Sequence, residues 1–178
     1  VIKAIKNDIA IYAIHTNLDN VHNGVSAKIA DKLGLENCKV LAPKNEVKNS
    51  SVGSGILGTL KTPISSTDFL KQLKSSMQTN CVRHTALVKD GIKTVAVCGG
   101  SGSFLLNNAI AAKADVFITA DFKYHEFFDA ENKIVIADIG HYESEQFTKD
   151  LIYDLLVKNF TKFAVRLSKV NTNPIKYL

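Results

Sequence analysis

The chain has no tryptophan, only three prolines and three cysteines, and no long run of apolar residues. Its apolar stretches fall well short of the ~18 residues that a membrane-spanning helix needs. Residues 1–8 carry charged side chains where a signal peptide would have its apolar core. These absences argue against a membrane protein, and we expect a cytoplasmic one.

Cysteine is too sparse and too widely spaced to build a framework. Cys38, Cys81 and Cys98 are odd in number and form no Cys-x-x-Cys pair. This spacing excludes a disulfide-based fold and a cysteine-based zinc ribbon. We expect all three to be free thiols buried among apolar side chains.

The remaining composition is that of a compact domain. The 178 residues are 46% hydrophobic and 22% charged, with a net charge of +5. The lysines are scattered and often stand beside acids, so the charge forms no basic stripe for nucleic acid, and we expect no such partner. We expect one domain over residues 1–178, with further sequence upstream because Val1 opens inside an apparently structured run.

The N-terminal half predicts one strand, two helices and a long loop. Residues 9–16 form a β-branched apolar run typical of a buried strand. Apolar positions at helical spacing predict a helix over residues 25–33, and the spacing resumes over 65–77, where Ser65 and Asp68 resemble a capping box. Between these helices, residues 42–58 are rich in Lys, Asn, Ser and Gly, which indicates a loop with a possible insertion point near 44–54.

The C-terminal half alternates strands with helices. The predicted elements are a strand at 93–98, a turn at 99–102, a helix at 103–113, a strand at 115–119, a short helix at 123–130, a strand at 134–139, a helix at 142–159 and a strand at 163–167. Such alternation implies crossover connections, so we expect an α/β fold with a layered parallel or mixed sheet covered by helices. Ligands in such sheets collect at the carboxyl ends of the strands.

Polar clusters follow three of the predicted strands, at residues 15–19, 119–125 and 140–145. His141 and Glu145 are four residues apart at the start of a helix, so both side chains fall on one face about a turn apart. Asp19 would supply a third ligand from another strand end. The alternatives remain open, because such a His and Glu can be a solvated pair and such an Asp a helix cap.

Imidazole and carboxylates together suit Zn²⁺, Mn²⁺ or Fe²⁺, and the absence of thiolate ligands argues against a purely structural zinc site. His15 and His125 are candidates for general acid and base groups, although His125 can also be a helix-start residue bonded to backbone. The glycines of residues 99–102 match neither dinucleotide nor Walker spacing, so they indicate a tight structural turn rather than a phosphate cradle.

Four segments in order carry a resemblance to a known family. They are residues 12–19 (Tyr-Ala-Ile-His-Thr-Asn-Leu-Asp), 95–103 (Val-Ala-Val-Cys-Gly-Gly-Ser-Gly-Ser), 119–125 (Thr-Ala-Asp-Phe-Lys-Tyr-His) and 140–145 (Gly-His-Tyr-Glu-Ser-Glu). They look like successive blocks of the NIF-three-like family, and residues 172–178 resemble its C-terminus. The chain therefore resembles the C-terminal part of that family and its α/β fold.

In that family a two-metal centre uses two adjacent histidines of an N-terminal block together with three residues of the later blocks. The matching positions here are Asp19, His141 and Glu145. The sequence contains no His-His pair, so we expect divalent metal to be incompletely bound, since affinity depends on ligand number. A second departure is Ala120, which stands where the family usually has glycine, and it is tolerable only if the backbone there avoids positive φ.

The resemblance implies a metal-dependent hydrolase similar to GTP cyclohydrolase 1 type 2 homologues, acting on a small-molecule substrate that the sequence does not identify. His125 or His15 would shuttle protons in such a reaction. The alternative is a metal-dependent regulatory or protein-interaction module without catalysis. The resemblance also implies a ring-shaped homohexamer.

Overall fold

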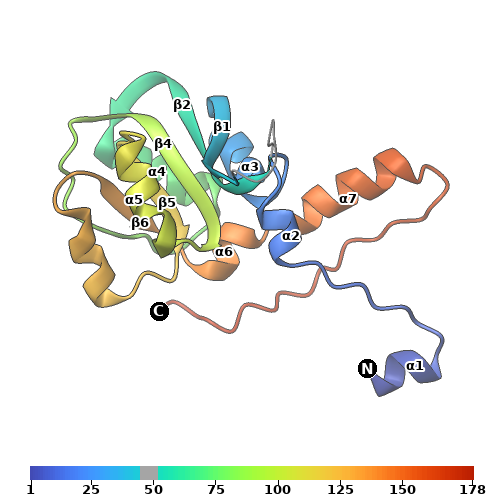
Figure 1. Cartoon of the computed structure of the whole chain (residues 1–178). Helices are drawn as coiled ribbons and strands as arrows, with labels where there is room; N and C mark the ends of the chain where they lie inside the picture. The colour runs from blue at the N-terminus through green and yellow to red at the C-terminus, as the bar shows by residue number, and fades with distance from the viewer. Residues whose placement is uncertain (45–51) are drawn as a thin grey trace.

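The computed structural model describes residues 1–44 and 52–178. In these residues six strands form one sheet in the order β1-β2-β4-β5-β6-β3, as Figure 1 shows. The strands are β1 (Glu36–Pro43), β2 (Gly53–Ser65), β3 (Arg83–His84), β4 (Gly91–Ser101), β5 (Val116–Ala120) and β6 (Val135–Asp138). Strands β4, β5 and β6 are parallel neighbours, while the pairs β1–β2, β2–β4 and β3–β6 are antiparallel. The mixed sheet confirms the predicted α/β class.

Helices lie on both faces of the sheet. They are α1 (Ile2–Lys6), α2 (Thr16–Asp19), α3 (Val25–Lys32), α4 (Ser66–Ser76), η1 (Ser103–Leu105), α5 (Leu106–Ala111), η2 (Tyr124–Ala130), α6 (His141–Glu145) and α7 (Thr148–Asn159). The predicted start of α4 is confirmed, because the Ser65 hydroxyl accepts a hydrogen bond from the Asp68 backbone N–H at 3.1 Å.

The central strands alternate between two apolar layers. Val95 and Val97 of β4 pack with the helices α3 and α4 on one face, whereas Ala96 packs with α5 on the other. On β5, Phe117 lies on the α5 face and is completely buried. Because successive strand side chains point to opposite faces, a continuously apolar strand must be covered on both sides. This burial fixes the carboxyl ends of β4, β5 and β6, where the candidate site lies.

Two predicted strands do not form. Residues 9–15 are an exposed extended segment leading into α2, and residues 163–167 are likewise irregular. In Figure 1 the segment before α2 runs away from the body to α1. No described strand lies beside either segment, so the backbone hydrogen bonds that define a strand have no partner.

The predicted loop over 42–58 is also wrong where it is described, because β1 ends and β2 begins within it. Residues 45–51, including most of the possible insertion point, lie outside the described residues. Small residues belong in β2 because neighbours approach closely. A Cβ at Gly55 would stand 3.0 Å from the Leu105 side chain and from the Val97 carbonyl oxygen.

Three smaller corrections concern boundaries and cysteines. The single helix predicted at 142–159 is two helices, α6 and α7. Between them, the Phe147 side chain is buried in the core and the Gln146 side chain donates a hydrogen bond to the Met77 carbonyl. Strand β4 continues through the predicted turn at 99–102 as far as Ser101. Of the cysteines, which are all free, Cys98 is buried as expected, but Cys81 is exposed because it lies in the irregular segment before β3.

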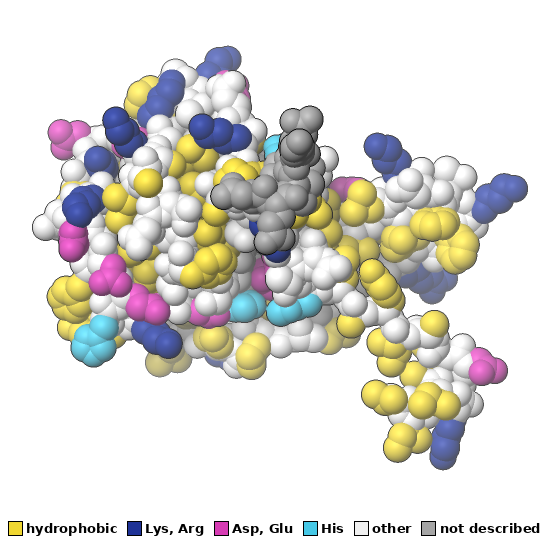
Figure 2. Space-filling view, viewed as in Figure 1, with side chains coloured by type: hydrophobic (Ala, Val, Ile, Leu, Met, Phe, Trp, Pro, Cys, Tyr) yellow, Lys and Arg dark blue, Asp and Glu magenta, His cyan; other side chains and the backbone are white. Residues whose placement is uncertain are grey.

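The surface carries an uneven distribution of apolar side chains. In Figure 2 they gather on the projecting terminal segments, and Ile5, Ile11 and Phe163 are each more than half exposed. Within the described residues, no helix has the length and apolar character needed to cross a membrane.

Candidate metal centre

Helix α6 begins directly after β6 and carries both predicted ligands of the final block. The preceding Gly140 has φ +90°, a conformation that L-residues rarely adopt, and it turns the chain sharply from strand to helix. His141 Nε2 then lies 3.4 Å from Glu145 Oε2, one helical turn along. The predicted pairing of these two side chains on one helix face is therefore present.

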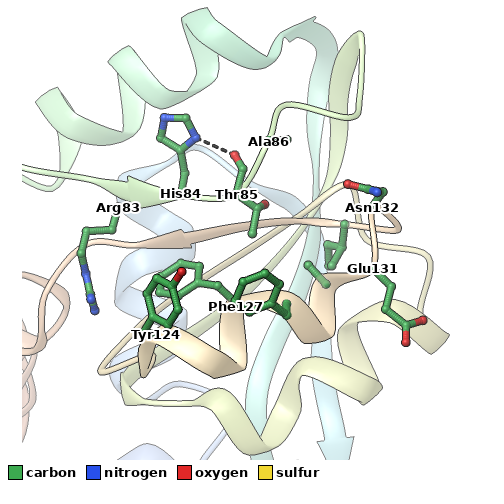
Figure 3. Close-up of a pocket in the computed structure, with 11 residues that line it drawn as sticks. Arg83, His84, Thr85, Ala86, Tyr124, Phe127, Glu131 and Asn132 are labelled. Atoms are coloured by element: carbon green, nitrogen blue, oxygen red, sulfur yellow. Dashed lines mark hydrogen bonds between the residues drawn. The ribbon is translucent and has the colours of Figure 1, made fainter.

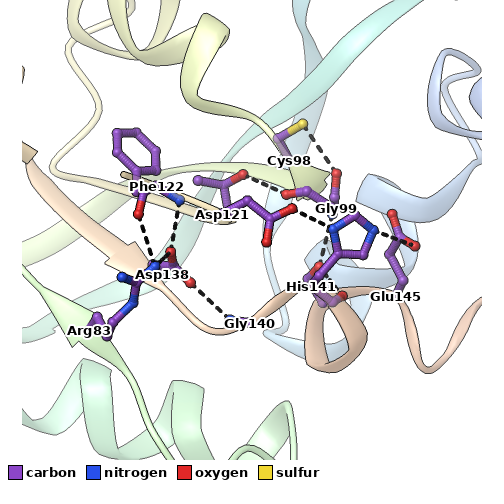
Figure 4. Close-up of polar contacts among 12 residues, drawn as sticks. Arg83, Cys98, Gly99, Asp121, Phe122, Asp138, Gly140, His141 and Glu145 are labelled. Atoms are coloured by element: carbon purple, nitrogen blue, oxygen red, sulfur yellow. Dashed lines mark hydrogen bonds and ion pairs between the residues drawn. The ribbon is translucent and has the colours of Figure 1, made fainter. Parts of the chain in front are cut away.

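Asp121 holds the other nitrogen of the same imidazole. It follows β5 with φ +59°, and its Oδ2 lies 2.6 Å from His141 Nδ1 (Figure 4). This hydrogen bond is the main reason that the pKa of His141 is raised, and the Glu145 and Asp19 carboxylates raise that pKa further. When the neutral imidazole donates Nδ1–H to a carboxylate, Nε2 keeps its lone pair, which is the usual arrangement of a metal-binding histidine.

The carboxyl end of β4 packs against these ligands. The Ser144 hydroxyl accepts a hydrogen bond from Gly100 N–H at 2.8 Å and donates to the His141 carbonyl at 2.8 Å. Gly100 has φ +64°, and a Cβ there would stand 2.4 Å from Glu145 Oε1. The backbone conformation thus favours glycine at this position, and a larger residue would displace the Glu145 carboxylate.

Asp19 reaches the site from α2. It lines a cavity of about 100 Å³ together with His15, Glu145 and Thr148. The Thr148 hydroxyl oxygen is buried and makes no hydrogen bond with any described residue.

The centre is rich in negative charge. Burial is the main cause that raises the pKa of both Asp19 and Glu145, and the Asp19 carboxylate adds to the effect on Glu145. Burial, with the same two carboxylates, raises the pKa of Cys98 to about 12. The Cys98 thiol is therefore protonated near neutral pH and poorly suited as a nucleophile or metal ligand.

The C-terminal segment reaches the same helix. Asn173 Nδ2 donates a hydrogen bond to Oε1 of the buried Glu143 at 2.9 Å, which ties the end of the chain to α6 between the two candidate ligands. Burial is the main cause that raises the pKa of Tyr177, and the Glu143 carboxylate raises it further, so a second residue of this segment interacts with Glu143.

The donor set fits a divalent ion in part. Nε2 of His141 and a carboxylate oxygen of Glu145 converge, and the Asp19 carboxylate faces the same cavity as Glu145. However, no three or more His, Cys, Asp or Glu side chains among residues 1–44 and 52–178 are already arranged around one ion position. The geometry is that of a two-donor element with a third carboxylate nearby.

The two predicted proton-transfer residues lie in different places. His15 lines the cavity of Asp19 and Glu145, and its Nδ1 lies 3.1 Å from the Thr16 hydroxyl. His125 lies on η2 with its ring against that of Tyr124, at 5.2 Å between centroids, and no hydrogen bond joins it to another described residue. The structure thus brings His15, but not His125, to the candidate ligands.

Comparison with known proteins agrees with the resemblance seen in the sequence. Residues 1–174 match the family described as Duf34/NIF3 (NGG1p interacting factor 3). The chain belongs to the Duf34/NIF3 family.

Its relatives include proteins named GTP cyclohydrolase 1 type 2 homolog. Those of Staphylococcus epidermidis and Clostridium perfringens are each 34% identical, over 73% and 82% of this chain. The chain spans only 37% and 55% of their respective lengths. The crystal structure of Staphylococcus aureus protein SA1388 shares the fold with a TM-score of 0.87 and 27% identity, covering 99% of this chain and 72% of that one.

Three residues of this Duf34/NIF3 chain escaped the sequence reasoning: Asp121, Ser144 and Gly100. Asp121 and Ser144 stood inside recognised blocks but carried no assigned role, although a carboxylate directly after a parallel strand is a signal for one. The sequence indicated that Gly100 is a turn glycine, whereas in the structure the Glu145 carboxylate occupies the place where a side chain at this position would lie. The question over Ala120 is also answered, because its φ is not positive and the left-handed conformation falls on Asp121 instead.

Proposed function

We propose that this chain holds a divalent ion, Zn²⁺, Mn²⁺ or Fe²⁺, between His141, Glu145 and Asp19, and acts as a metal-dependent hydrolase of a small molecule. The observation that carries the proposal is the orientation of the His141 ring. Asp121 engages Nδ1 at 2.6 Å, and Nε2 faces Glu145 at 3.4 Å. A solvated surface pair would not need a second carboxylate to fix the imidazole.

A divalent ion at this position would supply Lewis-acid chemistry and make a bound water acidic enough to attack near neutral pH. The protein residues have separate parts in that reaction. Asp121 keeps the proton of His141 on Nδ1, and Gly100 leaves room for the Glu145 carboxylate. His15 faces the same cavity, and in the tautomer whose Nδ1–H donates to the Thr16 hydroxyl it would accept and return the proton at Nε2. His125 stays a second candidate for proton transfer.

The names of the relatives support a hydrolytic reaction on a nucleotide-like substrate. Because this chain spans about half their length or less, their named activity is a proposal here. The missing His-His pair leads us to expect a single, weakly held ion rather than two tight ones.

Metal binding is the first test. Zn²⁺ would be titrated calorimetrically into the metal-free chain, into Glu145→Gln and into the matched control Glu131→Gln, an exposed acid on another segment. We expect Glu145→Gln to weaken binding at least about tenfold, since it removes an anionic ligand while keeping its shape. Equal affinities in all three proteins, or two tightly bound ions per chain, would contradict the proposal.

Activity is the second readout of the same proposal. The metal-loaded chain would be assayed for formate release from GTP and for cleavage of a generic phosphoester. We expect Asp121→Asn to reduce metal affinity and activity about 10–100-fold, the usual effect of losing the partner of a ligating histidine. Metal binding without turnover of either substrate would favour the non-catalytic role.

A protein-interaction module is the second candidate. The exposed apolar side chains of the terminal segments favour it, and Ile2 and Val170 are among the most exposed. Assembly into a homohexamer, which the resemblance implies, would bury these surfaces against other copies of the chain. We also propose that the protein is cytoplasmic. Light scattering of the purified chain at several concentrations tests the assembly, and a monomer at all of them would contradict it.

A further inference from the structure

A cavity of about 510 Å³ lies at the β3 edge of the sheet, away from the metal centre. It is bounded by residues 83–86 on one side and by side chains from residues 124–134 on the other (Figure 3). We call it the aromatic pocket. Its volume falls in the range of about 300–1,000 Å³ typical of small-molecule sites. It shares no lining residue with the cavity of Asp19 and Glu145.

Three aromatic rings of η2 form one wall. The Tyr124 and Phe128 rings stand edge to face with centroids 5.6 Å apart, and their residues are 73% and 66% exposed. Phe127 lies beside them and has the Arg83 guanidinium 5.4 Å from its ring centre. The open face of such an exposed ring is a surface on which another flat ring can stack.

The two ends of the aromatic pocket differ in polarity. Figure 3 shows Arg83 and Tyr124 at one end and Glu131 and Asn132 at the other. The Asn132 side-chain amide makes no hydrogen bond within the described chain, so both its donor and its acceptor remain available to a ligand. Glu131 and Asn132 both have positive φ, 45° and 56°. Glu131 is the left-handed C-cap of η2, which is a common way for a helix to end, and Asn132 follows it.

The charges around the pocket are already paired. Arg83 forms an ion pair with Asp138 and donates to the Phe122 carbonyl at 3.0 Å, while Glu131 pairs with Lys133. No lysine is among the described residues that line the pocket. A phosphate group would therefore find no open cation, and an uncharged ligand fits better.

We propose that the aromatic pocket binds adenosine or an uncharged compound with the same base. The flat ring would stack on Phe128, whose plane is steeply inclined to that of Tyr124, and the amide of Asn132 would meet the edge of the base. An amide pairs in two places with the adjacent donor and acceptor of adenine, N6–H and N7, whereas guanine shows two acceptors on that edge. This ligand site is independent of the proposed hydrolase function.

The test is titration of adenosine into the metal-free chain in a chelating buffer, followed by calorimetry and saturation-transfer NMR. We expect Phe128→Ala to weaken binding about fivefold or more, the lower end of what a lost base-stacking contact produces. Asn132→Gly should weaken it comparably, and glycine tolerates the left-handed backbone at this position.

Two matched controls guard against general effects. Phe104→Ala removes a phenylalanine that is also 66% exposed but lies outside the pocket, and Asn37→Gly replaces another left-handed asparagine, at φ 54°. Neither should change the dissociation constant. Absence of adenosine binding, tighter binding of AMP or guanosine than of adenosine, equal loss in the controls, or toluene binding equally well would each overturn the proposal.

Discussion

The segments 9–12 and 116–120 are both apolar and rich in β-branched residues, yet they meet opposite fates. All five residues of β5 are buried, and the strand pairs in parallel with β4 on one side and β6 on the other. Ile9 and Ile11 are 59% and 68% exposed in a segment without a strand neighbour. The difference shows that an apolar run becomes a strand only where neighbouring backbones accept its hydrogen bonds and helices cover its faces.

The same contrast divides the candidate site. Asp121 follows β5, and His141 and Glu145 lie on the helix that follows β6. A hydrogen bond of 2.6 Å joins Asp121 to His141, and Glu145 lies 3.4 Å from the other ring nitrogen of His141. Asp19 comes from α2, which follows the exposed N-terminal segment. The ligands that the sheet positions are therefore already paired, whereas the ligand carried by the peripheral helix is not part of a complete ion site.

The largest expected loss of stability comes from truncating a buried residue of β5. Phe117→Ala should lower the free energy of unfolding by about 3–5 kcal/mol, because it opens a cavity beneath α5 where the ring is fully buried. Ile11→Ala, in the exposed segment, should change it by less than about 0.5 kcal/mol. Urea unfolding followed by circular dichroism measures both. A similar decrease in the free energy of unfolding in the two variants would mean that residues 9–12 are buried in solution, and the contrast with β5 would be wrong.

A second prediction tests whether Gly100, at the end of β4, helps to hold Glu145 in place. Gly100→Ala should destabilise the protein by about 1–2 kcal/mol, the cost of a left-handed backbone, and it should displace the Glu145 carboxylate, whose Oε1 would stand 2.4 Å from the new Cβ. It should also weaken Zn²⁺ binding, since Glu145 must move.

Gly34→Ala is the matched control for that change. Gly34 has nearly the same φ, +67°, but a Cβ there would meet nothing within 4 Å. It should therefore carry only the backbone cost of about 1 kcal/mol and leave metal affinity unchanged. If both variants lost stability equally and bound Zn²⁺ like the parent chain, the close packing of Gly100 against Glu145 would be disproved.

The sequence predicted those parts of the fold that depend on local or strand-internal signals. The cap at Ser65, the helix after Gly24 and the apolar stretches of strands β4, β5 and β6 are each set by their own residues. The pairing of His141 with Glu145 was predictable for the same reason, because helical spacing alone places them together.

What the sequence could not predict depends on the neighbours of each segment. Gly53 and Gly55 look like loop residues, but they lie in β2 because adjacent strands and Leu105 leave no room for a side chain. Asp121 could not be assigned to His141 without knowing that β5 and β6 end side by side. The same limit applies to residues 9–16, whose apolar pattern says nothing about whether a partner strand exists.

The smallest effect tests a hydrogen bond that joins the C-terminal segment to the body. Asn173→Ala should lower the free energy of unfolding by about 1 kcal/mol, because it removes the donor to the buried Glu143 carboxylate. Asn7→Ala removes a hydrogen bond of similar length, from Nδ2 to the Lys3 carbonyl, in the exposed N-terminal segment and should have almost no effect. Because Glu143 stands between His141 and Glu145 on α6, Asn173→Ala should also weaken Zn²⁺ binding slightly, whereas Asn7→Ala should not. Unchanged stability and metal affinity in Asn173→Ala would place residues 160–178 with residues 1–15, as a segment that neither stabilises the sheet nor helps to hold the ligands.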